Sequence, residues 1–421
     1  MRVLLAHSGV QFLILTIALV ISVNPAISLA QGPVEGSKAA AMGTAFVAVA
    51  DDPSAILFNP AGLTQLQGTN FYSGGSLIVP SSEYKSPSGI SERTQLQAFF
   101  APHLYASSDF NTKEMCFGLG VYSPFGIGGT KWSETGLTRY VSTESLIGTV
   151  AVNPVVAWRL NPWLSLGGGF YYEYAQVRSE RLINQSSLGA EDGKFSLDSH
   201  GLGGGWGYNA GILLFPGQRF SFGLSYRSGS SVGEDMTVSL DNIAPALRPL
   251  LGGSSFKTGA SSRIDFPQAV CPGVAFRPTE RLTFSFDANW LGWSSLKVMN
   301  VDLQRTVPKA GVTDISIPFD YKNAWMFKAG FEYKLSDKLG LRGGYMYTQN
   351  DVPDITLNPG NPDANQHGVT LGFGYKKGRF TFDTFCLGTL YENRTVSNEI
   401  LSGEYQSFML VVGSSVNFKW K

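Results

Sequence analysis

The stretch from Arg281 to Trp290 alternates strictly between polar and apolar side chains. Because successive side chains of a β-strand point to opposite faces, such a strand has one polar and one apolar face. About fourteen runs of this kind follow one another, and an even number suits a closed barrel that crosses a membrane. They lie near 70–80, 93–106, 114–127, 146–159, 163–178, 206–215, 219–229, 266–277, 281–291, 321–335, 339–348, 367–376, 379–389 and 405–420. The pattern predicts an all-β fold, a transmembrane antiparallel β-barrel.

The connections between these runs are alternately short and long. The short ones, such as those at 161–162, 216–218 and 336–338, contain the Pro, Gly and Asp residues that tight turns require. Outer-membrane barrels place short turns on the periplasmic side and long loops outside. We therefore expect the long connections to face the exterior. They lie near 128–145, 179–205, 230–265, 292–320, 349–366 and 390–404, and an apolar helix is expected at 243–251.

The first thirty residues have the features of a secretory signal. Arg2 is followed by an apolar core at 10–23, and Ala30 ends a small-residue cleavage site. After it, the sequence has no uninterrupted apolar stretch long enough for a spanning helix, so any spanning must be done by a closed barrel. Residues 31–67 are rich in small side chains and do not alternate. We therefore divide the chain into a signal peptide at 1–30, a plug at 31–67 and a barrel at 68–421.

Composition argues against several other functions. The 32 basic and 32 acidic residues balance, so the sequence offers no basic field for nucleic acid. The 3 cysteines are far apart and lack metal-ligand spacing, and neither a disulfide framework, a metal nor a cofactor is expected. No GxSxG element accompanies the few histidines, so a nucleophile with its base is not apparent and we expect no enzyme.

Several blocks of the sequence resemble the FadL/TodX family of outer-membrane transporters for long-chain fatty acids and other hydrophobic compounds. The first block is the run from Ala45 to Leu63, AFVAVADDPSAILFNPAGL. The others keep the family's order along nearly the whole chain after residue 30. They are VYSPFGI at 121–127, NPVVAWRL at 153–160, GLSYRS at 223–228, FPQ at 266–268, LRGGY at 341–345 and PDA at 362–364.

The resemblance implies that the N-terminal plug is a hatch carrying the motif Asn59-Pro60-Ala61. The residues themselves predict a rigid turn, because proline fixes its own φ and restricts the asparagine before it. A plain turn without a gating role is the alternative interpretation.

The family's third strand is kinked and opens the barrel wall sideways, and here Pro124, Phe125 and Gly126 interrupt the third predicted strand. Proline lacks the donor that a ladder needs and glycine weakens pairing, so a gap is expected at this point. The alternative is that Pro124 only ends the strand at the outer rim.

A fatty acid would need a cation for its carboxylate and an apolar path for its chain. Alternation places Arg227, Lys328 and Arg342 on the inner face as head-group candidates, although an internal ion-pair network with Asp287 and Asp383 would also explain them. Aromatic residues on the same face could line the acyl path or simply fill the lumen. They are Phe99, Tyr122 and Tyr171.

We therefore expect a monomeric barrel in the bacterial outer membrane, in contact with outer-membrane lipid. Its expected role is the diffusive transport of long-chain fatty acids or similar hydrophobic molecules, with lateral exit into the membrane. A general porin and a lipid-modifying outer-membrane enzyme are the alternatives. The non-alternating plug argues against an open porin, and an adhesin would need only the loops.

Overall fold

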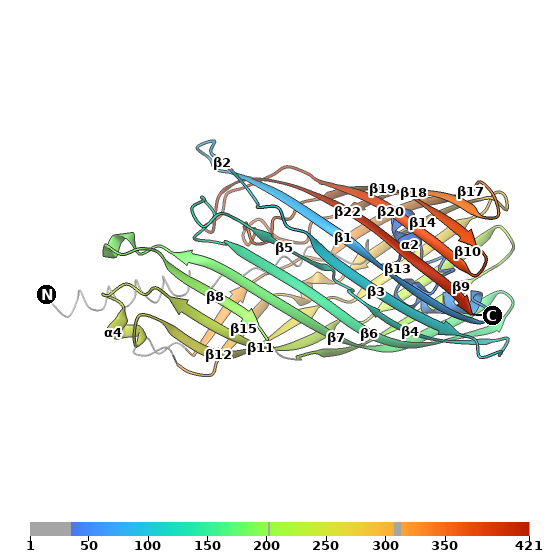
Figure 1. Ribbon diagram of the computed structural model, residues 1–421, viewed down its shortest axis with the longest axis horizontal. Helices are drawn as coiled ribbons and strands as arrows, with labels where there is room; N and C mark the ends of the chain where they lie inside the picture. Colours follow the sequence, from blue (N-terminus) through green and yellow to red (C-terminus); the bar gives the residue numbers. More distant parts are fainter. Residues whose placement is uncertain (1–34, 201–202, 307–312, 421) are drawn as a thin grey trace.

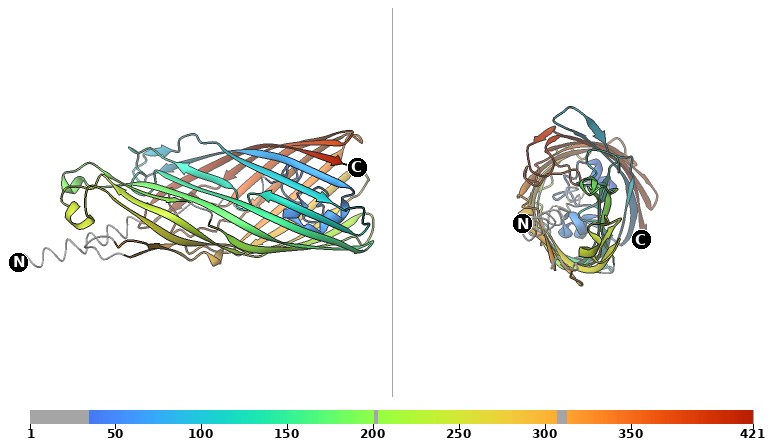
Figure 2. Two further views of the ribbon diagram at one scale, coloured as in Figure 1. Left: turned by 60° about the horizontal axis from the view of Figure 1, so that its bottom comes forward. Right: turned by 90° about the vertical axis from the view of Figure 1, so that its left-hand side faces the viewer.

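The computed structural model describes residues 35–200, 203–306 and 313–420. Its strands close into one elongated antiparallel barrel of fourteen strands, as the alternation predicts (Figure 1). The view along the axis shows the ring of strands around its contents (Figure 2). The expected signal peptide and the first residues of the expected plug lie outside the described residues. No helix within the described ranges is long and apolar enough to cross a membrane.

Six strands are continuous and the other eight are each divided into two segments. The continuous strands are β1 (Thr69–Lys85), β6 (Glu144–Asn161), β7 (Leu164–Ile183), β18 (Leu339–Thr348), β19 (Gln366–Lys377) and β22 (Gly403–Trp420). The divided strands are β2 (Ser91–Arg93) with β3 (Phe99–Ser108), β4 (Met115–Tyr122) with β5 (Ile127–Lys131), β8 (Gly193–Ser199) with β9 (Gly205–Leu214), β10 (Phe220–Arg227) with β11 (Ser230–Asp241), β12 (Phe256–Phe266) with β13 (Ala269–Phe276), β14 (Leu282–Leu291) with β15 (Val298–Leu303), β16 (Asp314–Pro318) with β17 (Ala324–Lys334), and β20 (Phe380–Tyr391) with β21 (Arg394–Val396).

The barrel closes between its first and last strands. β1 pairs with β22 along its whole length, from the pair Thr69 and Trp420 to the pair Lys85 and Glu404. Every other ladder is also antiparallel, which agrees with the predicted class of sheet.

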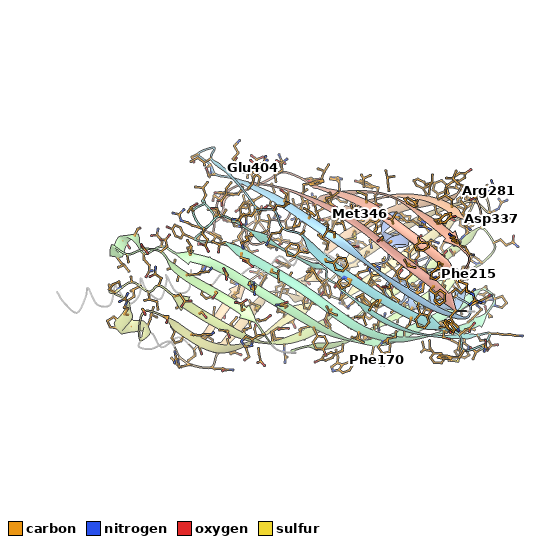
Figure 3. All side chains as sticks on the ribbon, viewed as in Figure 1. Phe170, Phe215, Arg281, Asp337, Met346 and Glu404 are labelled. Carbon is orange, nitrogen blue, oxygen red and sulfur yellow. The ribbon has the colours of Figure 1, made fainter. Side chains whose placement is uncertain are left out.

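The two faces of the wall differ in polarity as alternation requires. Phe284 and Phe286 on β14 are 47% and 46% exposed, whereas Ser285 between them is 5% exposed. Phe170 on β7 likewise extends from the outer surface, and Met346 on β18 is buried (Figure 3). The apolar face therefore points outward, where a membrane barrel meets lipid.

The short connections gather at one end of the barrel. Phe215, Arg281 and Asp337, each in or beside a short connection, lie at the end where the chain terminates, whereas Glu404 lies toward the other end (Figure 3). We call these the turn end and the loop end.

The loop end differs from the sequence-based expectation in several places. The connection expected at 230–265 is largely strand and forms the hairpin β11–β12, and the one expected at 292–320 contains the hairpin β15–β16. Alternation continues into them, with Val232, Met299 and Ile317 buried, so the wall extends beyond the predicted strands. The connection expected at 179–205 likewise contains a strand, β8, which pairs with β11.

Smaller differences concern single elements. The predicted strand 93–106 is divided into β2 and β3. The helix expected at 243–251 is only α4 (Arg248–Leu251), because Pro249 is tolerated in the first turn of a helix but not in its interior. The other short helices of the loop end are η2 (Ser186–Leu188) and η3 (Trp293–Ser295).

Residues 35–67, which we call the luminal segment, lie inside the barrel toward the turn end (Figures 1 and 2). The segment contains α2 (Ser37–Ala41), α3 (Ala55–Phe58) and η1 (Pro60–Gln65), and most of its side chains are buried. α2 forms on three consecutive alanines, which favour helix, and Gly43 with φ of +63° follows its end.

The connection at 349–366 is expected to face the exterior but instead folds inward. From residue 351 to residue 364 only Asp354 and Ile355 are exposed. We call residues 350–365 the outer strap. Its apolar residues Val352 and Leu357 pack into the same buried cluster as residues of β15 and β16, which explains why it does not project into solvent.

Candidate functional site

The luminal segment is fixed to the wall through Asn59. Its side-chain amide donates to the carbonyl of Val47 within the segment at 2.8 Å and to the carbonyl of Ile212 on β9 at 3.0 Å. Its Oδ1 accepts a hydrogen bond from Ala61 N at 3.2 Å and caps η1. Asn59-Pro60-Ala61, predicted as a rigid turn, is therefore the capped start of η1, and it also bonds the luminal segment to the barrel.

Glycines in the wall allow this close approach. A Cβ atom at Gly211 would lie 2.0 Å from Asn59 Oδ1, and one at Gly167 would lie 2.4 Å from Ala61 N. The same relation holds at β17, where a Cβ at Gly330 would lie 2.1 Å from the carbonyl oxygen of Met42. Any side chain at these positions would overlap the luminal segment, so the backbones meet only because the residues are glycine.

A buried network of charges ties the same segment to the wall. Arg342 contacts Glu332 at 2.8 Å and Asp383 at 2.5 Å, and Lys38 of the luminal segment contacts Asp51 at 2.8 Å and Glu332 at 3.4 Å. Burial lowers the pKa of Lys38, but the Asp51 and Glu332 carboxylates outweigh it and raise that pKa above its usual range. Arg342 thus occupies the internal ion-pair network that sequence reasoning kept as an alternative.

The third strand is interrupted between Tyr122 and Ile127. Tyr122 pairs with Ala151 of β6 and Ile127 pairs with Gly148, so residues 123–126 stand opposite only residues 149–150. Gly126 adopts φ of +78°, a conformation that favours glycine, in a turn closed onto Ser123. We call residues 123–126 the wall interruption.

The third strand also loses its pairing with the second strand, on the side that faces β3. The ladder between β3 and β4 stops at the pair Leu104 and Val121, and no ladder in the described part of the chain joins residues 99–103 to β5. These residues still pair with β1. The wall therefore has an opening in its hydrogen bonding between β3 and β5, which we call the wall opening.

A cavity of about 50 Å³ brings the luminal segment, the wall interruption and two buried cations together. It is lined by Val47, Leu57, Phe58, Pro124, Ser225, Arg227, Ala269, Cys271, Asn289 and Lys328. The Arg227 guanidinium lies 4.2 Å from the Tyr171 ring centroid and 5.4 Å from that of Phe125. Within the described residues, neither Arg227 nor Lys328 has a carboxylate within 4 Å.

Glu35 connects the luminal segment to the wall interruption. Its Oε1 accepts a hydrogen bond from Ser123 N at 2.9 Å, and the side chain is fully buried. Burial raises the pKa of Glu35, and the bond from Ser123 and the charge of Arg227 lower it only in part. Sequence reasoning missed this residue, because a single glutamate before a small-residue segment has no distinctive pattern.

The three aromatic candidates lie in two places. Tyr122 donates to Asn153 Oδ1 at 2.9 Å and Tyr171 to the carbonyl of Ser228 at 2.7 Å, and both rings lie near Arg227. Phe99 instead packs against a separate cluster that contains Ala40 and Ala41 of α2. The structure therefore brings Tyr122 and Tyr171 to the cavity region but not Phe99.

Aromatic residues that the sequence did not single out continue from the cavity toward the loop end. Phe125 stacks on Phe266 with ring centroids 4.6 Å apart, and Trp293 lies 5.9 Å from both Phe125 and Tyr321. They join an apolar cluster, which we call the outer lining. Its other members include Ile147, Val232, Met236, Val238, Leu291, Leu296, Met299, Val301, Ile315, Ile317 and Phe319. Trp293 could not be found from alternation, because it lies in a short helix between strands.

Among the described residues no group of three or more His, Cys, Asp or Glu side chains is placed to hold a metal ion. The arrangement offers buried cations beside an apolar path and an interrupted wall.

Comparison with known proteins gives consistent matches. Residues 18–384 match the model of a family described as outer membrane protein transport protein (OMPP1/FadL/TodX). The long-chain fatty acid transport protein of Escherichia coli K12 is 23% identical over 363 residues, covering 78% of this chain and 79% of that protein.

Solved structures show the same fold. The crystal structure of a Pseudomonas aeruginosa FadL homologue has a TM-score of 0.78 at 17% identity, covering 93% of this chain and 99% of that one. The P. putida toluene transporter TodX has a TM-score of 0.71 at 16% identity, covering 88% and 94%.

Proposed function

The chain belongs to the OMPP1/FadL/TodX family of outer-membrane transport proteins for hydrophobic compounds, and we propose that this member carries long-chain fatty acids and releases them sideways into the bilayer. The family consists of channels rather than enzymes. Within it, the names of relatives differ in cargo: the E. coli protein is named for long-chain fatty acids and the P. putida protein for toluene.

One observation carries the choice of cargo: Arg227 and Lys328 line the same cavity as Phe58 and Pro124. Lys328 stands opposite Asp287 in the β14–β17 ladder and Arg227 lies near Glu173, but neither cation forms an ion pair within 4 Å among the described residues. A buried cation with only such longer-range carboxylate neighbours is stabilised further when a ligand supplies a negative charge at hydrogen-bonding distance. A fatty acid brings a carboxylate that forms strong, charge-assisted hydrogen bonds with such groups. An aromatic hydrocarbon has no group that would use them.

The outer lining suits the rest of such a molecule. Each CH₂ group that leaves water gains about 0.8 kcal/mol, so a long acyl chain avoids a water-filled pore and favours an apolar route. In the proposed route the cargo passes the outer lining and then the rings of Phe125 and Trp293. Its head group reaches Arg227 and Lys328 beside the wall interruption.

The remaining steps concern the luminal segment and the wall. The luminal segment fills the barrel at the turn end, and we assign it the role of a hatch, with Asn59-Pro60-Ala61 as its attachment to β9. The cavity adjoins Pro124, so the wall opening is the proposed lateral exit. Transport along this route follows the concentration gradient of the cargo.

The head-group assignment is tested by replacing Lys328 with Met in the purified barrel. Binding of palmitate should weaken by roughly tenfold, while binding of the uncharged hydrocarbon hexadecane should stay within about twofold, because only the acid loses a charge-assisted bond. Tryptophan fluorescence or equilibrium dialysis measures both. Lys334→Met, at an exposed position of the same strand β17, is the matched control. Equal loss for both ligands would contradict a carboxylate site.

The lateral exit is tested by filling the wall interruption with Pro124→Thr and Gly126→Val. Threonine restores a backbone donor, and valine disfavours the positive φ of Gly126, so both changes favour a continuous strand. We expect a folded barrel with palmitate uptake reduced several-fold in cells that lack their own transporter. Normal uptake by a variant shown to have a continuous strand would place the exit elsewhere.

A further inference from the structure

The outer strap has a fixed shape inside the lumen. Asn358 accepts a hydrogen bond from Gly360 N at 2.8 Å and donates to the carbonyl of Thr356 at 3.0 Å. Thr356 donates in turn to the carbonyl of Phe319 at 2.9 Å. These hydrogen bonds give the strap a defined conformation. A segment with a defined conformation can fix the distance between the two parts of the wall that it contacts.

Both legs of the strap are anchored at β21 and the residues that follow it. Arg394 donates to the carbonyl of Val352 at 2.6 Å and to that of Asp363 at 3.0 Å, so a single guanidinium joins both legs of the strap. Asn398 donates to the carbonyls of Asp354 at 2.7 Å and Leu357 at 2.9 Å.

The middle of the strap reaches β5 on another side of the lumen. The carbonyl of Pro359 accepts hydrogen bonds from Trp132 Nε1 at 2.9 Å and from Thr130 Oγ1 at 3.2 Å. The Trp132 ring is fully buried. Asn361 and Pro362 also line a small cavity with Gly129 and Thr130 and with residues of β1 and β22. The strap therefore contacts β5 directly.

β5 is the segment whose position determines the wall opening. Its one ladder among the described residues joins it to β6, and toward β3 its backbone makes a single recorded bond, from Gln95 N to the carbonyl of Lys131 at 2.7 Å. Residues 99–103 of β3 likewise have no ladder on this side. Two unpaired strand edges so close in sequence and space would be expected to pair.

We propose that the outer strap is a positioning element that holds β5 out of the ladder with β3, through the two hydrogen bonds to the Pro359 carbonyl. Without these bonds, β5 moves toward β3, so that the wall interruption and the start of β5 pair with residues 99–103 and the wall opening closes. The effect on transport rests on the proposed lateral exit. The effect on strand pairing does not, so the two can be measured separately.

The test removes both donors while keeping their bulk, with Thr130→Val and Trp132→Phe. Hydrogen–deuterium exchange followed by mass spectrometry then reports on the amides of residues 99–103 in the folded, detergent-solubilised barrel. A new ladder should slow the exchange of those amides of residues 99–103 that face the wall interruption and the start of β5 by roughly tenfold or more, and palmitate uptake should fall in parallel. Trp132→Phe alone is the milder variant, used if the double variant does not fold.

Lys131→Met is the matched control, because Lys131 lies on β5 but pairs with Glu144 of β6 rather than with the strap. It should leave exchange at 99–103 unchanged. Unchanged exchange in the strap variants as well would overturn the proposal, whatever the uptake. Slowed exchange with normal uptake would support the positioning role and would instead contradict lateral exit through this opening.

Discussion

The two ends of the lumen are built on different principles. Toward the turn end, the luminal segment meets the wall through glycine backbones and paired charges, such as Gly330 against Met42 and Arg342 between Glu332 and Asp383. Toward the loop end, the outer lining is an array of aromatic and aliphatic side chains. Close backbone contact and paired charges seal a passage because they leave no room for a guest. An apolar lining makes few directional contacts, so a hydrophobic molecule can slide along it.

The largest effect should come from breaking a pair at the sealed end. Arg342→Met leaves Asp383 buried without its cation and Glu332 with Lys38 alone, and loss of one partner from a buried pair costs about 3 to 5 kcal/mol. The free energy of unfolding in lipid vesicles, measured with urea, should fall by that amount.

Arg227→Met provides the contrast for this prediction, because no carboxylate lies within 4 Å of Arg227 among the described residues. The same urea experiment should show a clearly smaller loss of stability than Arg342→Met. An equal loss from both changes would contradict the distinction between Arg342, as part of a structural ion-pair network, and Arg227, as a cation available to the cargo.

The next effect should come from adding one methyl group where the luminal segment meets the wall. Gly330→Ala places a Cβ 2.1 Å from the carbonyl oxygen of Met42, and such overpacking costs about 1 to 3 kcal/mol. Because the luminal segment moves more easily than the barrel, influx of a small polar dye into proteoliposomes should rise. Gly388→Ala, whose nearest neighbour would be 3.8 Å away, should change neither property.

The smallest effect should appear at the loop end, in the pH response of the outer strap. Burial, together with the nearby Asp363, raises the pKa of Asp351 well above its usual range. Since the folded-in strap favours protonated Asp351, this contribution is complete at low pH and is lost as pH rises through the raised pKa. Maleimide labels the thiolate, so its rate rises with pH at any cysteine. The labelling rate of Leu357→Cys, a buried position of the strap, should therefore rise toward alkaline pH more steeply than that of an exposed reference cysteine.

Asp351→Asn is the control for the pH response, because its amide does not ionise. Labelling in the Asp351→Asn background, divided by the rate of an exposed cysteine at the same pH, should be nearly independent of pH. A pH dependence that survives this change would assign the titration to another group, such as Tyr321 or Asp363.

Alternation predicted the wall well because it is a local property of each strand. Phe284 and Ser285 could be assigned to opposite faces without knowing their neighbours. The inward direction of Arg342 followed from the same rule, but its partners Glu332 and Asp383 depend on the stagger between strands, which a single sequence does not state. The proline and glycine of the wall interruption were visible as breaks in a pattern.

Other features carried no periodic signal. The strap is rich in Asn, Pro and Asp, the composition of an exposed loop, and only its bonds to Trp132 and Arg394 place it inside. Glu35 is a single residue whose importance arises from contact with a strand far along the chain. The role of the Asn59 motif came from the family resemblance, because the residues alone indicated no more than a turn.

The seam between β1 and β22 constrains the order in which this molecule can be assembled. The luminal segment immediately precedes β1, whereas the strand that completes the ring is the last one synthesised. An enclosed segment that fits against glycines on several strands cannot easily be threaded through a finished ring. Enclosure and ring closure are therefore coupled events, and the nascent barrel must remain an open sheet, with two unprotected margins, until the C-terminal strand arrives.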